Sequence, residues 1–196
     1  MRKILFVISL VFSLPLFSQG LTTGYRGFGN IDYETYTGSG RMNGSGLGIT
    51  TTHGYQINPH LFVGAGVGFI FTGDCKYGEV SGHPYLKRDS KTDVPLFFDL
   101  NISFLKKAIT PFIDAKVGAI ANDDFNACLA LSAGCKFPVS DNMGLSIKVG
   151  FNERKASCGE LNLIPGTKYN NYQSTFVYEN EVQGIGGFSI GLSLDF

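Results

Sequence analysis

Large apolar residues alternate with small or polar residues along most of the chain, and the pattern is strictest at positions 184–196. From position 188 onward every even residue is large and apolar, whereas the odd residues are serine, glycine or aspartate. A period of two places alternate side chains on opposite faces of a strand. The stretch is therefore predicted to be a β-strand with one apolar face, formed by Phe188, Ile190, Leu192, Leu194 and Phe196.

The same period predicts seven earlier strands, at residues 22–37, 46–57, 61–71, 93–105, 112–121, 127–137 and 143–152 or beyond. Turn-forming residues such as Asn58-Pro59-His60 separate some of them. Short connections alternate with mostly longer ones, of which 74–92 and 157–183 are the longest. An even number of antiparallel strands joined in this way is typical of membrane barrels. We therefore expect an all-β fold, an eight-stranded antiparallel up-and-down transmembrane β-barrel.

The chain begins with a short basic head, followed by an apolar run at 4–17 and by Ser18-Gln19-Gly20. This order is typical of a secretory signal peptide. The apolar run contains Pro15 and is shorter than the roughly 20 residues of a membrane-spanning helix. We expect a cleaved signal peptide at 1–19, an outer-membrane barrel domain at 20–196, and no transmembrane helix.

Composition adds two points to this picture. The chain has 26 glycines, 17 phenylalanines and 9 tyrosines but no tryptophan, which favours strands and tight turns. Removal of Arg2 and Lys3 with the signal peptide would leave 14 basic residues against 16 acidic residues. That balance gives no sign of a nucleic-acid partner.

The polar faces of the strands carry sparse charges of both signs, whereas the apolar faces are almost free of charge. A soluble lipid-binding barrel would turn the apolar face inward around a ligand. A membrane barrel turns it outward, and a one-residue slip would then move lysines into lipid at about 2–4 kcal/mol each near the midplane. We favour the membrane arrangement, which places these charges in the lumen: Arg26, Asp32, Glu34, Asp99, Asp114, Lys116, Lys136, Lys148 and Asp195.

An eight-stranded barrel encloses only enough space for its own side chains. Buried charges persist when they are paired, so Arg26 is expected to pair with Asp195, and Asp99 and Asp114 are expected to lie beside Lys116. Such a network favours a structural plug. A narrow path for ions or small solutes is the alternative.

Few sequence patterns point to chemistry. The glycines at 64–68 resemble a phosphate-binding loop, but no helical period follows them, and room inside a narrow barrel is the better explanation. No metal-binding or hydrolase motif is present. Only His83 with Ser81 and Asp89 suggests a catalytic group of an outer-membrane lipid-modifying enzyme. We expect a non-enzymatic protein without cofactor or metal.

Four cysteines are present, at positions 75, 128, 135 and 158. Cys128 and Cys135 lie on opposite faces of one predicted strand and cannot bond to each other. Export permits disulfides, and the candidates are Cys128 with Cys158 or Cys75 with Cys158. Four unpaired thiols are the alternative.

The two long connections carry basic and aromatic residues and are the best candidates for contacts at the cell surface. Residues 173–178 keep the parity of the closing strand, so the last two strands are expected to extend as a ribbon above the membrane. A strand edge there can bind a partner by strand addition, and ordinary extension of the barrel is the alternative. The candidate contact residues are Lys87, Arg88, Tyr169, Tyr172, Phe176 and Tyr178.

The signal peptide, the alternating strands, the turn at Asn58-Pro59-His60, the Asp93-Val94-Pro95-Leu96 segment and the final Phe196 together resemble a known family. It is the small eight-stranded outer-membrane β-barrel domain family of Gram-negative bacteria, the porin-like and OmpX-like group. The resemblance implies that Phe196 is an assembly signal read by the barrel-assembly machinery. It also implies a monomer in outer-membrane lipid and lipopolysaccharide, with both termini periplasmic and an envelope-structural or surface-binding role through its extracellular loops.

Overall fold

The computed structural model describes residues 23–36, 43–80, 83–104, 109–140, 143–164 and 175–196. The expected signal peptide lies outside these residues. Within these ranges every regular element is a strand, and no helix long and apolar enough to cross a membrane is found. The strands are β1 (Gly24–Tyr36), β2 (Gly44–Asn58), β3 (Leu61–Thr72), β4 (Cys75–Val80), β5 (His83–Arg88), β6 (Lys91–Asp93), β7 (Pro95–Ser103), β8 (Thr110–Ile120), β9 (Asn126–Ser140), β10 (Met143–Ile164) and β11 (Thr175–Asp195).

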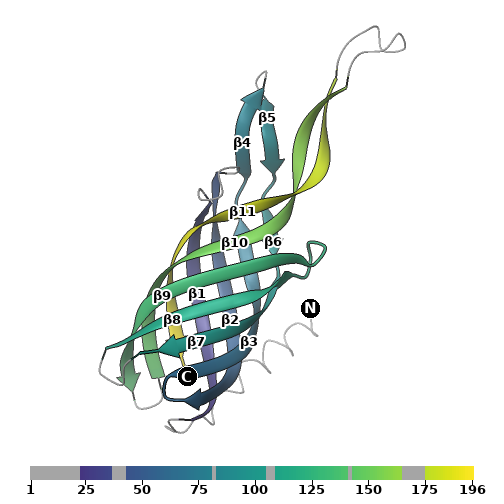
Figure 1. Ribbon diagram of the computed structural model, residues 1–196. Coiled ribbons are helices and arrows are strands. Elements are labelled where there is room, and N and C mark those ends of the chain that lie inside the picture. The colour runs from purple at the N-terminus through teal and green to yellow at the C-terminus, as the bar shows by residue number, and fades with distance from the viewer. Residues whose placement is uncertain (1–22, 37–42, 81–82, 105–108, 141–142, 165–174) are drawn as a thin grey trace, which may run out of the picture.

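Eight of these strands close into an antiparallel barrel (Figure 1). The order around the ring is β1, β2, β3, β7, β8, β9, β10 and β11, and β11 pairs back with β1. The closing ladder places Phe28 opposite Asp195, and beyond it Gly27 and Phe196 exchange backbone hydrogen bonds of 2.9 and 3.0 Å. The predicted fold class is therefore confirmed.

The barrel turns its apolar faces outward. Along β7 every second residue is buried and every other one is exposed, and Phe98 on the outer face is 72% exposed. Exposed aromatic side chains lie near both ends of the strands, Tyr55 and Phe104 toward the short turns and Phe69 and Phe188 toward the opposite end. An outward apolar band with aromatic residues at both ends suits a lipid bilayer and opposes the soluble ligand-binding alternative.

Glycines in β3 leave room for aromatic rings inside the barrel. The rings of Phe62 and Phe97 occupy the space that side chains at Gly64 and Gly66 would need. Both rings are buried. Because this segment is continuous strand, a phosphate-binding loop is excluded there, and the packing explanation holds.

The fourth predicted strand, 93–105, is divided in the structure. β6 pairs with the end of β3, Val94 lies between β6 and β7, and β7 ends at Ser103. Pro95 has no backbone N–H, so a regular ladder cannot continue through it. The side chain of Asn122 compensates by accepting a 2.8 Å hydrogen bond from the Val94 amide.

The long connection predicted at 74–92 is itself mostly strand. The segment forms the β4–β5 hairpin, whose alternation is obscured by Gly78 and Pro84. Gly78 adopts φ of 60°, a left-handed conformation that favours glycine. The segment 157–183 is also mostly strand. β10 and β11 pair without a register shift from Gly144 opposite Asp195 to Ile164 opposite Thr175, and this continuous pairing forms the predicted ribbon.

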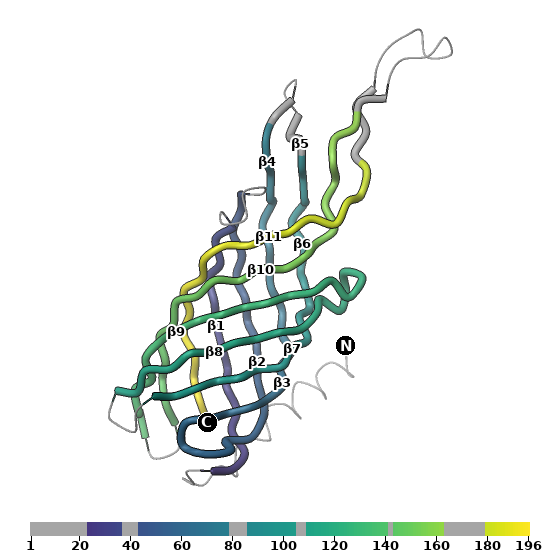
Figure 2. The backbone as a smooth tube through the Cα atoms, in the orientation of Figure 1, coloured from purple at the N-terminus to yellow at the C-terminus, as the bar shows by residue number. Residues whose placement is uncertain are grey.

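The hairpin and the ribbon project from the same end of the barrel (Figures 1 and 2). β5 pairs with β10 through Lys87 opposite Gly159 and Leu86 opposite Glu160. The two projections therefore form one sheet in the order β11, β10, β5, β4. We call β4, β5 and the ends of β10 and β11 at 153–164 and 175–186 the raised sheet.

Substitutions of two exposed valines test where the lipid-facing surface of the barrel ends. Val117 on β8 is 58% exposed within the barrel, and Val182 on β11 is 54% exposed in the raised sheet. We expect Val117→Lys to lower the free energy of unfolding in lipid vesicles by about 2–4 kcal/mol, because the lysine would face hydrocarbon. Val182→Lys, which would face water, should change it by less than about 0.5 kcal/mol. Equal effects, measured by urea titration with circular dichroism, would contradict the assignment.

Candidate functional site

The lumen contains charged side chains in layers, and the innermost layer lies at the end where the short turns connect the strands. Asp195 faces inward because it has the opposite parity to Phe196 on β11. Its carboxylate pairs with Lys136 at 2.7 Å and with Arg26 at 3.4 Å. Lys136 also lies over the ring of Phe28, 4.9 Å from its centroid. One buried carboxylate therefore joins three strands.

The middle layer contains two groups of paired charges. Lys148 on β10 reaches past β11 to Asp32 on β1 at 3.0 Å, and it donates a 3.3 Å hydrogen bond to Asn30. On the other side Lys116 lies 3.3 Å from Asp114 and 3.9 Å from Asp99. These carboxylates and lysines are all buried or nearly so, which makes pairing necessary.

The outer layer is centred on Arg154 of β10, which is buried. Its guanidinium pairs with Glu34 at 2.9 Å and with Asp93 at 3.2 Å. It also donates hydrogen bonds of 2.6 Å to the hydroxyl of Tyr36 and 2.9 Å to that of Thr72. Arg154 thereby connects β1, β3, β6 and β10 across the barrel.

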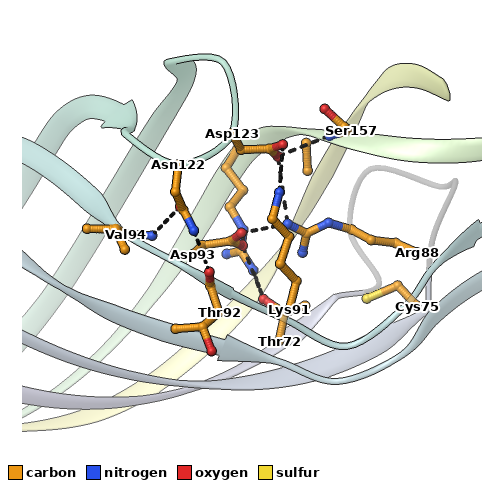
Figure 3. A network of polar contacts seen from close by, with 12 residues as sticks. Thr72, Cys75, Arg88, Lys91, Thr92, Asp93, Val94, Asn122, Asp123 and Ser157 are labelled. Carbon is orange, nitrogen blue, oxygen red and sulfur yellow. Dashed lines mark hydrogen bonds and ion pairs between the residues drawn. The ribbon is translucent and has the colours of Figure 1, made fainter.

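A further set of charges ties the raised sheet to the rim (Figure 3). Arg88 at the end of β5 pairs with Asp93 at 2.6 Å and lies 3.7 Å from Asp123 in the β8–β9 turn. Asp123 also pairs with Lys91 at 2.9 Å and accepts a 3.1 Å hydrogen bond from the Ser157 amide. Burial alone would raise the pKa of Asp123, but the hydrogen bonds from Lys91 and Ser157 hold it below its usual value.

A small apolar cluster lies next to these charges, under the raised sheet. It consists of Tyr36, Cys75, Ala156, Cys158 and Ile185, each at most 2% exposed. Burial raises the pKa of the Cys158 thiol to about 11, although the nearby Arg88 opposes this shift. The cluster and the paired charges together fill the outer mouth of the barrel.

Neither candidate disulfide is present, and all four cysteines carry thiols. Cys75 on β4 pairs in register with Arg88, and the neighbouring Lys87 of β5 is opposite Gly159 of β10. The backbone of β5 therefore lies between the strands that carry Cys75 and Cys158, although both side chains belong to the apolar cluster. Cys128 lies lower, on the inner face of β9, opposite Arg154 rather than Cys158.

Two cavities of the described barrel lie between the layers. The upper one, of about 80 Å³, is bounded by the outer and middle layers. The lower one, of about 10 Å³, lies between the middle and innermost layers. Asp114, Lys116 and Lys148 line both cavities, so the middle layer separates them.

The structure brings all nine predicted lumen charges into these layers. The prediction for Arg88 as a surface contact is wrong, because its side chain is buried against Asp93. Lys87 is partly exposed and pairs with Asp89 at 2.8 Å. Tyr169, Tyr172 and Ser81 lie outside the described residues, and for Phe176, Tyr178 and His83 only the backbone is described.

Sequence reasoning missed Arg154, Lys91 and Asp123. Arg154 continues the inward parity of Lys148 two residues beyond the predicted end of its strand, so a longer strand would have indicated it. Asp123 lies in a turn, where no periodicity indicates direction. Lys91 lies in a segment that was expected to be a loop.

The final residue closes the outer face near the short turns. The ring of Phe196 packs over Gly27 and meets the edge of His53, with centroids 6.2 Å apart. His53 contacts the Tyr25 hydroxyl at 2.5 Å and the Thr51 hydroxyl at 3.0 Å. These contacts satisfy both ring nitrogens.

No known family model matches the sequence, and no curated protein matches it. Among solved structures, the chain is similar to the outer membrane protein OprG from Pseudomonas aeruginosa, with 13% identity and a TM-score of 0.50 over 88% of this chain and 96% of that one. It is also similar to the outer membrane protease OmpT from Escherichia coli, with 8% identity and a TM-score of 0.37 over 89% and 95%. The second likeness is too weak to support a conclusion.

The closed ring and its outward apolar band define a membrane β-barrel. The likeness to OprG shows the fold alone, and that fold is the one of small outer-membrane β-barrels.

Substitutions of two arginines test how much the outer layer contributes to the free energy of unfolding. Arg154→Met would leave Glu34 and Asp93 buried without their partner, so we expect a loss of about 3–5 kcal/mol in the free energy of unfolding. Arg26→Met is the control, because Arg26 is 32% exposed and Asp195 keeps Lys136. It should cost about 1 kcal/mol or less. Urea unfolding in vesicles measures both, and equal costs would contradict the layered network.

Proposed function

We propose that the protein is a non-conducting, non-enzymatic barrel of the outer membrane with an envelope-structural or surface-binding role through its raised sheet. The observation that carries this proposal is the ion-pair network at the outer mouth. Arg154 and Arg88 join the barrel wall to the raised sheet through the shared carboxylate of Asp93. A mouth held closed in this way suits a rigid platform better than a path for solutes.

The balance of charge in the lumen supports the proposal of a non-conducting barrel. Seven basic side chains meet seven acidic ones in the ion pairs of the described lumen and rim. A neutral, layered interior offers a permeant ion neither attraction nor a continuous space, because the two cavities are separated. The narrow-pore alternative would require the middle layer to part.

The non-enzymatic part of the proposal rests on the same pairing. Each of the seven acidic side chains in the described network faces a basic partner. Paired carboxylates of this kind are held as structural ions rather than kept available for proton transfer.

The proposal extends to the partners of the protein. We propose a monomer that contacts outer-membrane lipid and lipopolysaccharide along its apolar band and that the assembly machinery recognises through Phe196. The short turns then lie on the periplasmic side together with both termini, and the raised sheet lies outside the cell.

Planar-bilayer recordings test the closed barrel. We expect the inserted wild-type protein to give no stepwise current in 1 M KCl. The double variant Lys148→Ala/Arg154→Ala should conduct cations intermittently, because it removes two plugging side chains and leaves Asp32 and Glu34 without these partners.

Arg26→Ala is the control for that experiment, since it removes a partly exposed charge outside the middle and outer layers. It should remain silent. Uniform, long-lived current steps from the wild-type protein would overturn the proposal and favour a pore.

A further inference from the structure

The upper cavity, which we call the chamber, exists because one wall has small side chains. Strand β9 contributes Cys128, Ala130 and Ser132 to its lining. Thr50 on β2 and Asn152 on β10, the strand next to β9, contribute longer polar side chains. The wall therefore leaves a space of about 80 Å³ below the outer layer, lined by apolar as well as polar side chains.

Asn152 projects into this chamber without a protein partner. Its side chain is buried, with the residue 7% exposed, and neither Oδ1 nor Nδ2 has a hydrogen-bond partner in the described protein. Its neighbours across the sheet are Ala130 on β9 and Gly187 on β11, which have no polar side-chain atoms. The buried hydroxyl of Thr50 also lacks a partner there.

A buried amide with both ends unsatisfied is costly, and native structures almost always supply a partner. The buried charged residues around the chamber are already engaged: Lys148 pairs with Asp32, and Arg154 with Glu34. A charged guest would bring an uncompensated charge into this neutral surrounding. The chamber is therefore suited to an uncharged molecule that both donates and accepts hydrogen bonds.

We propose that the chamber is a binding site for a compact uncharged molecule of the carboxamide or urea class, held by Asn152. A primary amide presents a donor beside an acceptor, and so pairs with another amide through two hydrogen bonds. The chamber has room for about two or three water molecules, which is comparable with a molecule of about four non-hydrogen atoms. The Thr50 hydroxyl supplies a further contact.

Refolding provides access to a site below a closed mouth. The protein is refolded into detergent micelles in the presence of increasing acetamide, and the backbone amide resonances of Ala130 and Gly187 are followed by NMR. We expect a saturable shift with a dissociation constant in the millimolar range, as befits so small a ligand. Asn152→Leu should abolish it, and Asn152→Ser, whose side chain is too short to pair, should weaken binding at least tenfold.

Ser146→Ala is the matched control, because Ser146 is buried and lines the lower cavity rather than the chamber. It should keep the wild-type shift. The proposal is overturned by a wild-type protein that shows no saturable shift, by an equal shift in Asn152→Leu, or by a crystal structure of the acetamide-refolded protein with only water at Asn152. Amide binding does not depend on the proposed function, since current through the wild-type barrel would contradict that function alone.

Discussion

The rest of the structure depends on the pairing of charges inside a lumen that has little room for water. Each of the three layers joins strands that are far apart in sequence, as Lys148 on β10 joins Asp32 on β1. Removal of one partner would leave a buried charge unpaired, so the network favours a single register for the barrel. The lipid outside enforces the same register, because a slipped strand would place its lysines in hydrocarbon.

The same pairing explains how the raised sheet is held. Backbone pairing between β5 and β10 is short, with only two residue pairs in the described strands. The ion pairs of Arg88 with Asp93 and Asp123 add a connection to two parts of the rim. Beneath them the apolar cluster around Tyr36 and Cys158 removes the remaining space at the mouth. The raised sheet and the closed barrel are therefore held by one network.

Periodicity was sufficient to predict the eight barrel strands and the inward charges, because parity along a strand fixes which face a residue occupies. Lys148 and Asp195 are examples, since each has large apolar neighbours on both sides. The β4–β5 hairpin escaped prediction because Gly78 and Pro84 interrupt its short alternation. The contacts of Arg88 and Asp123 depend on how the hairpin folds back on the rim, and a one-dimensional pattern does not contain that information.

The central claim is that the apolar faces meet lipid around a closed, charge-paired interior. Electrophoretic mobility of the protein extracted from outer membranes, compared with and without boiling in denaturing detergent, tests it most directly. The strands pair around the whole ring, and the backbone hydrogen bonds between Gly27 and Phe196 lie at its closure. Such a barrel should resist the detergent until heated and change its mobility on boiling. Recovery in the soluble periplasmic fraction, with the same mobility before and after boiling, would contradict the account.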